Sequence, residues 1–108
     1  MKTTTIRLSA YAESELEIRS TLIDEDEDGP NIAAALRAYD WRRGVLVVPH
    51  DKAETIWRGL TELANICDAL AEDRSISPDE RRANRHACRG LTTAAQKAIR
   101  LTACPGRG

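Results

Sequence analysis

The chain has 108 residues, which suits one domain, and hydrophobic residues make up 42% of it, a globular rather than a disordered composition. No apolar run approaches the roughly 20 residues that cross a membrane, and the first residues lack the apolar segment of a secretory signal. Three cysteines, at positions 67, 88 and 104, are odd in number and widely spaced. They are typical of free thiols in a reducing compartment, so we expect a single cytoplasmic domain over residues 1–108.

The net charge of −1 conceals a strong segregation of charge along the chain. Residues 1–30 carry three basic and eight acidic groups, whereas residues 74–108 carry eight basic and two acidic groups. Segregated charge either steers charged partners or is cancelled inside the fold. The sequence leaves both interpretations open.

The first 22 residues predict a β-hairpin. The stretch "TTTIRLS" at residues 3–9 is rich in β-branched residues, which favour strands. In "ELEIRSTL" at residues 15–22, strand alternation places Leu16, Ile18 and Leu22 on one face, whereas a helix would separate Leu16 from the other two. We therefore expect two strands that turn near residues 12–14.

An unbroken acidic run follows, in the stretch "LIDEDEDGPN". Its five members are Asp24, Glu25, Asp26, Glu27 and Asp28. A calcium loop alternates its ligands and ends on a glutamate at the twelfth position, which here is Ala35, so no metal site is predicted. One or two of the acids complement the dipole of a following helix. The remaining acids exceed what a helix start requires, and they favour an acidic patch that binds a basic partner.

A short helix is expected over about residues 30–40, because Pro30 suits a first helical turn and Ile32, Leu36 and Tyr39 share a face. The apolar run at residues 45–48 then predicts a short third strand, buried on both faces. With the hairpin, these elements form a β-rich half over residues 1–49.

The other half, residues 51–103, predicts an antiparallel helical hairpin. Residues 52–72 repeat apolar side chains at spacings of three and four, and Asp51 is expected to cap this helix. Inside a helix, Gly59 lowers helix stability by about 1 kcal/mol relative to alanine. A close approach of another backbone would explain a glycine at this position. A second helix begins at Ser77-Pro78, a strong start signal, and a four-residue link leaves the two helices antiparallel.

The last helix carries a basic stripe opposite its small-residue core face. Its members are Arg82, Arg85, Arg89 and Arg100. The stripe is either a solvated polar face or a site for nucleic acid or an acidic protein surface. No aromatic residue interleaves it, so stacking of unpaired bases along it is not predicted.

The sequence holds none of the motifs that carry common chemistry. There is no Cys-x-x-Cys, no phosphate-binding glycine loop and no Gly-x-Ser-x-Gly, and His86 and Cys88 lie two residues apart on a helix without facing each other. We therefore predict no catalytic residue, no metal and no cofactor. The chain is expected to work by binding.

Residues 3–42 resemble the ribbon-helix-helix DNA-binding proteins, through "TTTIRLS" and, about thirty residues on, "AALRAY". The resemblance implies a dimer whose first strand pairs with a partner's strand and reads the major groove through Thr3, Thr5 and Arg7. The expected strand at residues 15–22 departs from the family, which has a helix there. The acidic run departs as well, because it lies near the start of the second helix, where the family meets phosphate.

These patterns predict an α+β fold, built from the N-terminal hairpin, a short third strand, one short helix and the C-terminal helical hairpin. The leading functional hypothesis is a phage or mobile-element inhibitor of a host nucleic-acid-handling complex, of the anti-CRISPR kind. It would bind a basic protein surface through the acidic run, as a nucleic-acid mimic. The alternative is a dimeric DNA-binding regulator or antitoxin, and direct binding of nucleic acid ranks second to a protein partner.

Overall fold

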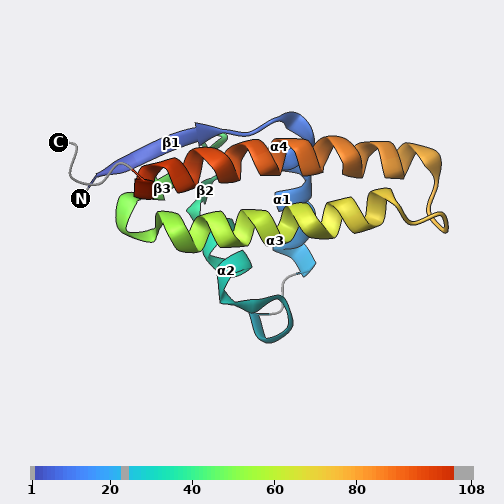
Figure 1. Cartoon of the computed structure of the whole chain (residues 1–108), viewed down its shortest axis with the longest axis horizontal. Coiled ribbons are helices and arrows are strands. Elements are labelled where there is room, and N and C mark those ends of the chain that lie inside the picture. Colours follow the sequence, from blue (N-terminus) through green and yellow to red (C-terminus); the bar gives the residue numbers. More distant parts are fainter. Residues whose placement is uncertain (1, 23–24, 104–108) are drawn as a thin grey trace.

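The computed structural model describes residues 2–22 and 25–103, with the backbone alone for residues 21–22, 25–28 and 102–103. It confirms an α+β fold in which two long antiparallel helices run along the long axis of the molecule (Figure 1). The elements in chain order are β1 (Thr3–Arg7), α1 (Ala10–Leu22), α2 (Glu25–Ala38), β2 (Tyr39–Asp40), β3 (Val45–Pro49), the 3-10 turn η1 (His50–Lys52), α3 (Ala53–Ala71) and α4 (Pro78–Ala103).

The predicted N-terminal β-hairpin is wrong in its second half, because residues 15–22 belong to helix α1. The helix begins where the hydroxyl of Ser9 accepts a hydrogen bond from the backbone N–H of Ala12, at 3.2 Å. It buries Ala12 and Leu16, four residues apart on one face, and leaves Ile18 51% exposed. The predicted strand placed Ile18 on the buried face together with Leu16. The prediction failed because single exposed isoleucines are common, and an eight-residue pattern does not distinguish an exposed isoleucine from a buried one.

The three strands form one antiparallel sheet in the order β1-β3-β2. The predicted third strand is confirmed as β3, and β1 pairs with it across some forty residues of chain, with Thr5 opposite Val47. Residues directly opposite one another lie on the same face of a sheet. The buried pair of Ile6 and Leu46 therefore marks the inner face, which packs on the helices.

The outer face of the sheet carries a row of three residues, one from each strand. Arg7 lies opposite Val45, and Val45 lies opposite Asp40 on its other side. The row therefore runs from the end of β1 to the turn between β2 and β3, a span of two strand spacings, roughly 10 Å.

Helix α2 starts earlier than predicted, at Glu25, and is kinked at Gly29 (φ 85°, ψ 163°). This left-handed φ favours glycine. The segment from Pro30 to Ala38 matches the predicted helix, but Tyr39 opens β2 instead of ending the helix.

The predicted helical hairpin is confirmed as α3 and α4, although one predicted cap is wrong. Asp51 lies inside η1, and α3 starts after Lys52 without a side-chain cap, because the chain leaves β3 through a 3-10 turn. The cap of α4 is as predicted: the backbone N–H of Glu80 donates to the hydroxyl of Ser77 at 3.2 Å.

A single hydrophobic core joins the sheet and the helices. At its centre α2 crosses α3 over Gly59, where an added Cβ would lie 2.1 Å from the carbonyl oxygen of Asn31. This is the close backbone approach that the sequence suggested as a reason for the glycine. None of the described helices is long and apolar enough to cross a lipid bilayer.

Candidate nucleic-acid interface

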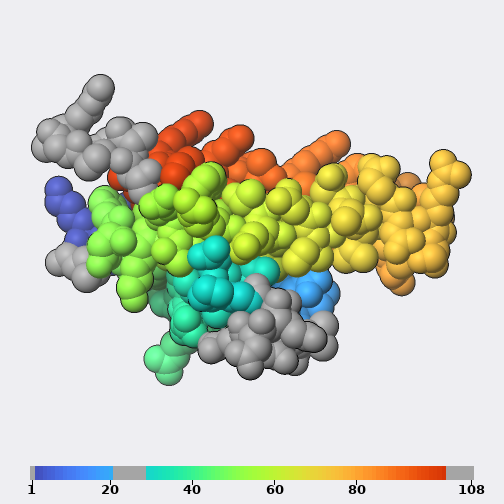
Figure 2. Space-filling model, turned by 60° about the horizontal axis from the view of Figure 1, so that its bottom comes forward, coloured from blue at the N-terminus to red at the C-terminus, as the bar shows by residue number. Residues whose placement is uncertain are grey.

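The four arginines of the basic stripe all lie exposed on the outer face of α4. Within the described part of the chain, none of them forms an ion pair. The only acidic residues of α4 are Asp79 and Glu80 in its first turn, so the rest of the helix carries positive charge alone. Side chains of α4, in orange and red, project along one edge of the molecule (Figure 2).

Strand β1 extends this positive surface. Its outward residues Thr3, Thr5 and Arg7 are exposed, and α4 runs beside the strand (Figure 1). Arg7 and Arg89 line the same shallow hollow, of about 260 Å³, so the fold brings together two groups that lie over eighty residues apart in sequence. We call the basic face the surface made by Thr3, Thr5, Arg7, Arg82, Arg85, Arg89 and Arg100.

The hollow between β1 and α4 has a defined construction. Its wall includes Tyr11 and His86, whose rings stack with centroids 4.8 Å apart and planes 23° apart. A Cβ at Gly90 would lie 2.2 Å from the hydroxyl oxygen of Ser9, so the glycine lets the start of α1 approach α4. Two guanidinium groups beside such a hollow suit a phosphate, which arginine binds through paired hydrogen bonds.

The turn between β2 and β3 adds further positive charge that the sequence interpretation missed. Trp41, Arg42 and Arg43 are all exposed there. The turn lies at the end of the outer-face row that starts at Arg7. The available signal was the stretch "WRRG", a cationic and aromatic turn, which is short enough to be overlooked beside the longer stripe.

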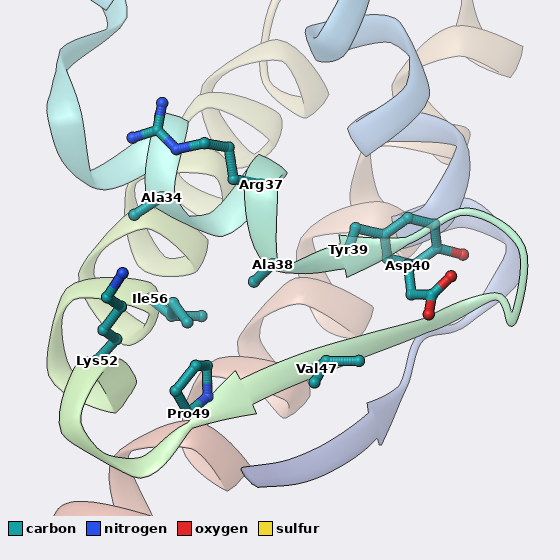
Figure 3. A pocket seen from close by; sticks show the side chains of 9 residues that line it. All are labelled: Ala34, Arg37, Ala38, Tyr39, Asp40, Val47, Pro49, Lys52 and Ile56. Atoms are coloured by element: carbon teal, nitrogen blue, oxygen red, sulfur yellow. The ribbon is translucent and has the colours of Figure 1, made fainter. Parts of the chain in front are cut away.

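A second concavity, of about 570 Å³, lies between α2, the β2–β3 hairpin and α3 (Figure 3). Arg37 and Lys52 lie toward one end of it and Tyr39 and Asp40 toward the other. The remaining lining is apolar: Ala34, Ala38, Val47, Pro49 and Ile56.

Both polar groups at the second end of this groove serve the fold. The hydroxyl of Tyr39 donates to Glu13 at 2.5 Å, and burial together with this carboxylate raises the pKa of Tyr39 to about 12. A carboxylate oxygen of Asp40 accepts the backbone N–H groups of Arg42 and Arg43, at 3.1 and 3.2 Å. The groove therefore offers apolar contact and cations, not a pair of groups poised for proton transfer.

The predicted acidic patch lies largely outside the described side chains. Asp24 is outside the described residues, and residues 25–28 are described by their backbone, as the first turn of α2. The carboxylates themselves are therefore not placed relative to the basic face.

Of the two described cysteines, Cys67 belongs to the hydrophobic core and Cys88 is half-buried against it. Cys67 is fully buried, and burial, followed by the nearby carboxylate of Glu15, raises the pKa of its thiol to about 12. Glu15 is itself buried and pairs with Arg19 at 3.2 Å. A neutral, buried thiol is a poor nucleophile. In the described ranges no three His, Cys, Asp or Glu side chains are placed to hold a metal ion.

No protein-family model, no curated protein and no solved structure matches this chain.

Proposed function

We propose that this chain is a small, non-enzymatic cytoplasmic protein that binds nucleic acid through the basic face. The observation that carries the proposal is the hollow that Arg7 of β1 and Arg89 of α4 both line. It joins two exposed rows of polar and cationic side chains into one surface. Lys and Arg that neutralise phosphates release condensed counterions, and this supplies most of the affinity of sequence-independent binding.

The arrangement gives the DNA-binding alternative more support than the sequence did. The chain order strand, helix, helix over residues 3–38 is the order that a ribbon-helix-helix protein has, and α1 removes one of the two departures from that family. Two differences remain: the acidic run still lies at the start of the second helix, and β1 pairs with β3 of its own chain, whereas the family pairs the strand with a partner's. The proposal therefore concerns the basic face of a single chain and does not require a dimer.

Fluorescence anisotropy with labelled nucleic acid tests the proposal. Wild type should bind a 20-base-pair duplex or a 20-nucleotide single strand at 50 mM salt and weaken steeply by 200 mM. Replacing Arg85, Arg89 and Arg100 by glutamine should lower the slope of log K against log salt by about 1 for each phosphate that the variant no longer neutralises.

The matched control removes the same charge elsewhere, through Lys52→Gln, Arg58→Gln and Arg74→Gln, all exposed positions outside the basic face. This control should keep most of the affinity. An absence of binding at 50 mM salt, or an equal loss in the two triple variants, would contradict the proposal.

A second candidate is the inhibitor predicted from the acidic run. Helix α2 begins at Glu25, so four of the five acids fall within about one helical turn, which ends at the kink at Gly29. A compact group of carboxylate positions is what a nucleic-acid mimic requires, because spaced negative charge competes with phosphates for a basic channel. The partner would then be a host nucleic-acid-handling complex.

This candidate makes a different prediction. Changing residues 24–28 to their amides should abolish binding to such a complex and leave nucleic-acid binding intact or stronger. The control neutralises five acids elsewhere: Glu54, Glu62, Asp68, Glu72 and Asp79. Unchanged inhibition after neutralising the run would remove the acidic run from the mechanism.

A further inference from the structure

The turn between β2 and β3 presents an aromatic ring to solvent. Trp41 is 49% exposed, and its ring lies edge-to-face with Tyr39, with centroids 4.5 Å apart and planes 75° apart. Tyr39 is buried and anchored through its hydroxyl to Glu13 of α1. The ring of Trp41 is therefore supported from one side and accessible from another.

The backbone of the same turn is fixed in advance. Asp40 accepts the backbone N–H groups of Arg42 and Arg43 through its side chain, and that of Gly44 through its carbonyl at 2.8 Å. Gly44 has a left-handed φ of 68°, which closes the turn. A site held in this way loses little conformational entropy when a ligand binds.

Charge and aromaticity coincide at this turn. Arg42 and Arg43 follow Trp41 directly in the chain and are exposed like it, and the outer-face row leads from the turn to Arg7 of the basic face. The carboxylates of Asp40, in the turn, and Glu13, beside Gly44, already accept hydrogen bonds from the protein. An exposed aromatic ring with arginines next to it in the same turn suits the stacking of an unpaired base and the binding of its phosphates.

We propose that residues 41–43 form a stacking site for an unpaired base, with Trp41 as the platform and Arg42 and Arg43 on the flanking phosphates. This inference rests on the proposed function and names its ligand class, a single strand or a structure with unpaired bases. The sequence alone argued against stacking, because no aromatic residue interleaves the stripe on α4. The fold supplies the aromatic ring from a different element.

The two tryptophans of the chain provide a direct test. Trp57 is half-buried on α3, beneath the guanidinium of Arg58, whose carbon lies 5.6 Å from the ring centroid. In a Trp57→Phe variant, Trp41 is the sole tryptophan. Its emission should be quenched saturably by a twelve-nucleotide oligothymidylate and much less by a twelve-base-pair duplex, in which the bases are already stacked.

Affinity provides the second measurement. In the otherwise wild-type chain, Trp41→Ala should weaken binding of the single strand by about 5- to 150-fold, the range expected for one stacked base. Trp41→Phe keeps a ring and should retain most of the affinity. Duplex affinity and the far-UV circular dichroism spectrum should stay unchanged, which separates loss of stacking from loss of folding.

The outcomes separate this inference from the function on which it rests. If anisotropy reports binding of the single strand while the emission of Trp41 does not change, the basic face binds nucleic acid and the stacking site is overturned. An equal effect of Trp41→Ala on duplex and single strand overturns it as well. If neither form binds wild type, the proposed function and the stacking site are overturned together.

Discussion

At the scale of single residues, burial decides which titratable groups keep their protons. Cys67 lies on the core face of α3 with no exposed surface, and Tyr39 is buried at the start of β2. Each has a carboxylate beside it, Glu15 for the thiol and Glu13 for the phenol. Burial and these negative charges both disfavour ionisation, so the pKa of each group is raised to about 12.

We predict that the protein loses stability above pH 9 through these two groups. An unfolded thiol releases its proton near pH 9 and an unfolded phenol near pH 10, whereas the folded forms hold theirs to about pH 12. Between these values the unfolded state binds fewer protons, so the free energy of unfolding falls as pH rises. Urea unfolding at pH 8 and pH 10.5 measures the drop, which Cys67→Ala and Tyr39→Phe should each reduce. Equal drops in wild type and both variants would contradict this assignment.

At the scale of elements, α3 is the centre of the molecule. It packs against α4 along its length and against α2 where the two helices cross. The crossing requires the glycine at position 59, because the backbone of Asn31 occupies the place of a side chain. An unfavourable helix residue is thus explained by a packing contact.

We predict that Gly59→Ala destabilises the protein by about 1–3 kcal/mol, the usual cost of overpacking a close contact. In an unobstructed helix the same change would stabilise by about 1 kcal/mol, so the sign itself is diagnostic. Chemical denaturation measures the effect. Asn65→Ala, at an exposed position of α3, is the matched control and should be neutral or slightly stabilising. A stabilising Gly59→Ala would show that α2 does not cross α3 here.

At the scale of the whole molecule, no described acidic side chain neutralises the basic stripe. The four arginines of the basic stripe are exposed and have no ion-pair partner in the described ranges. Two ion pairs that are described, Glu15 with Arg19 and Glu54 with Arg58, each join neighbouring turns of one helix. The positive charge of the C-terminal region is therefore available to a partner.

We predict that the chain unfolds in one cooperative transition. Residues from β1, α1, α2, β3, α3 and α4 share one hydrophobic core, so neither the N-terminal half nor the helical hairpin has a core of its own. Far-UV circular dichroism, which follows the helices, and tryptophan fluorescence, which follows Trp41 and Trp57, should give the same midpoint in urea. Two separated midpoints would show that the hairpin α3–α4 folds independently.

The sequence by itself determined the elements whose signals are local and long. The amphipathic repeat of α3, the Ser77 cap of α4 and the β-branched residues of β1 each predict their element without reference to the rest of the chain. The class of the fold followed from these. Helix α1 was not predicted because strand alternation matched residues 15–22 better than a helix, which separates Leu16 from Ile18. The structure accommodates that separation by burying Leu16 and exposing Ile18.

Only the tertiary structure decided how the elements meet. The pairing of β1 with β3, the crossing at Gly59 and the hollow that Arg7 and Arg89 both line all join segments far apart in the chain. Such contacts depend on the whole packing arrangement, which no local pattern encodes. The basic stripe was visible in the sequence, but its continuation onto β1 through Arg7 was not. That continuation is what turns a charged helix face into a candidate nucleic-acid site.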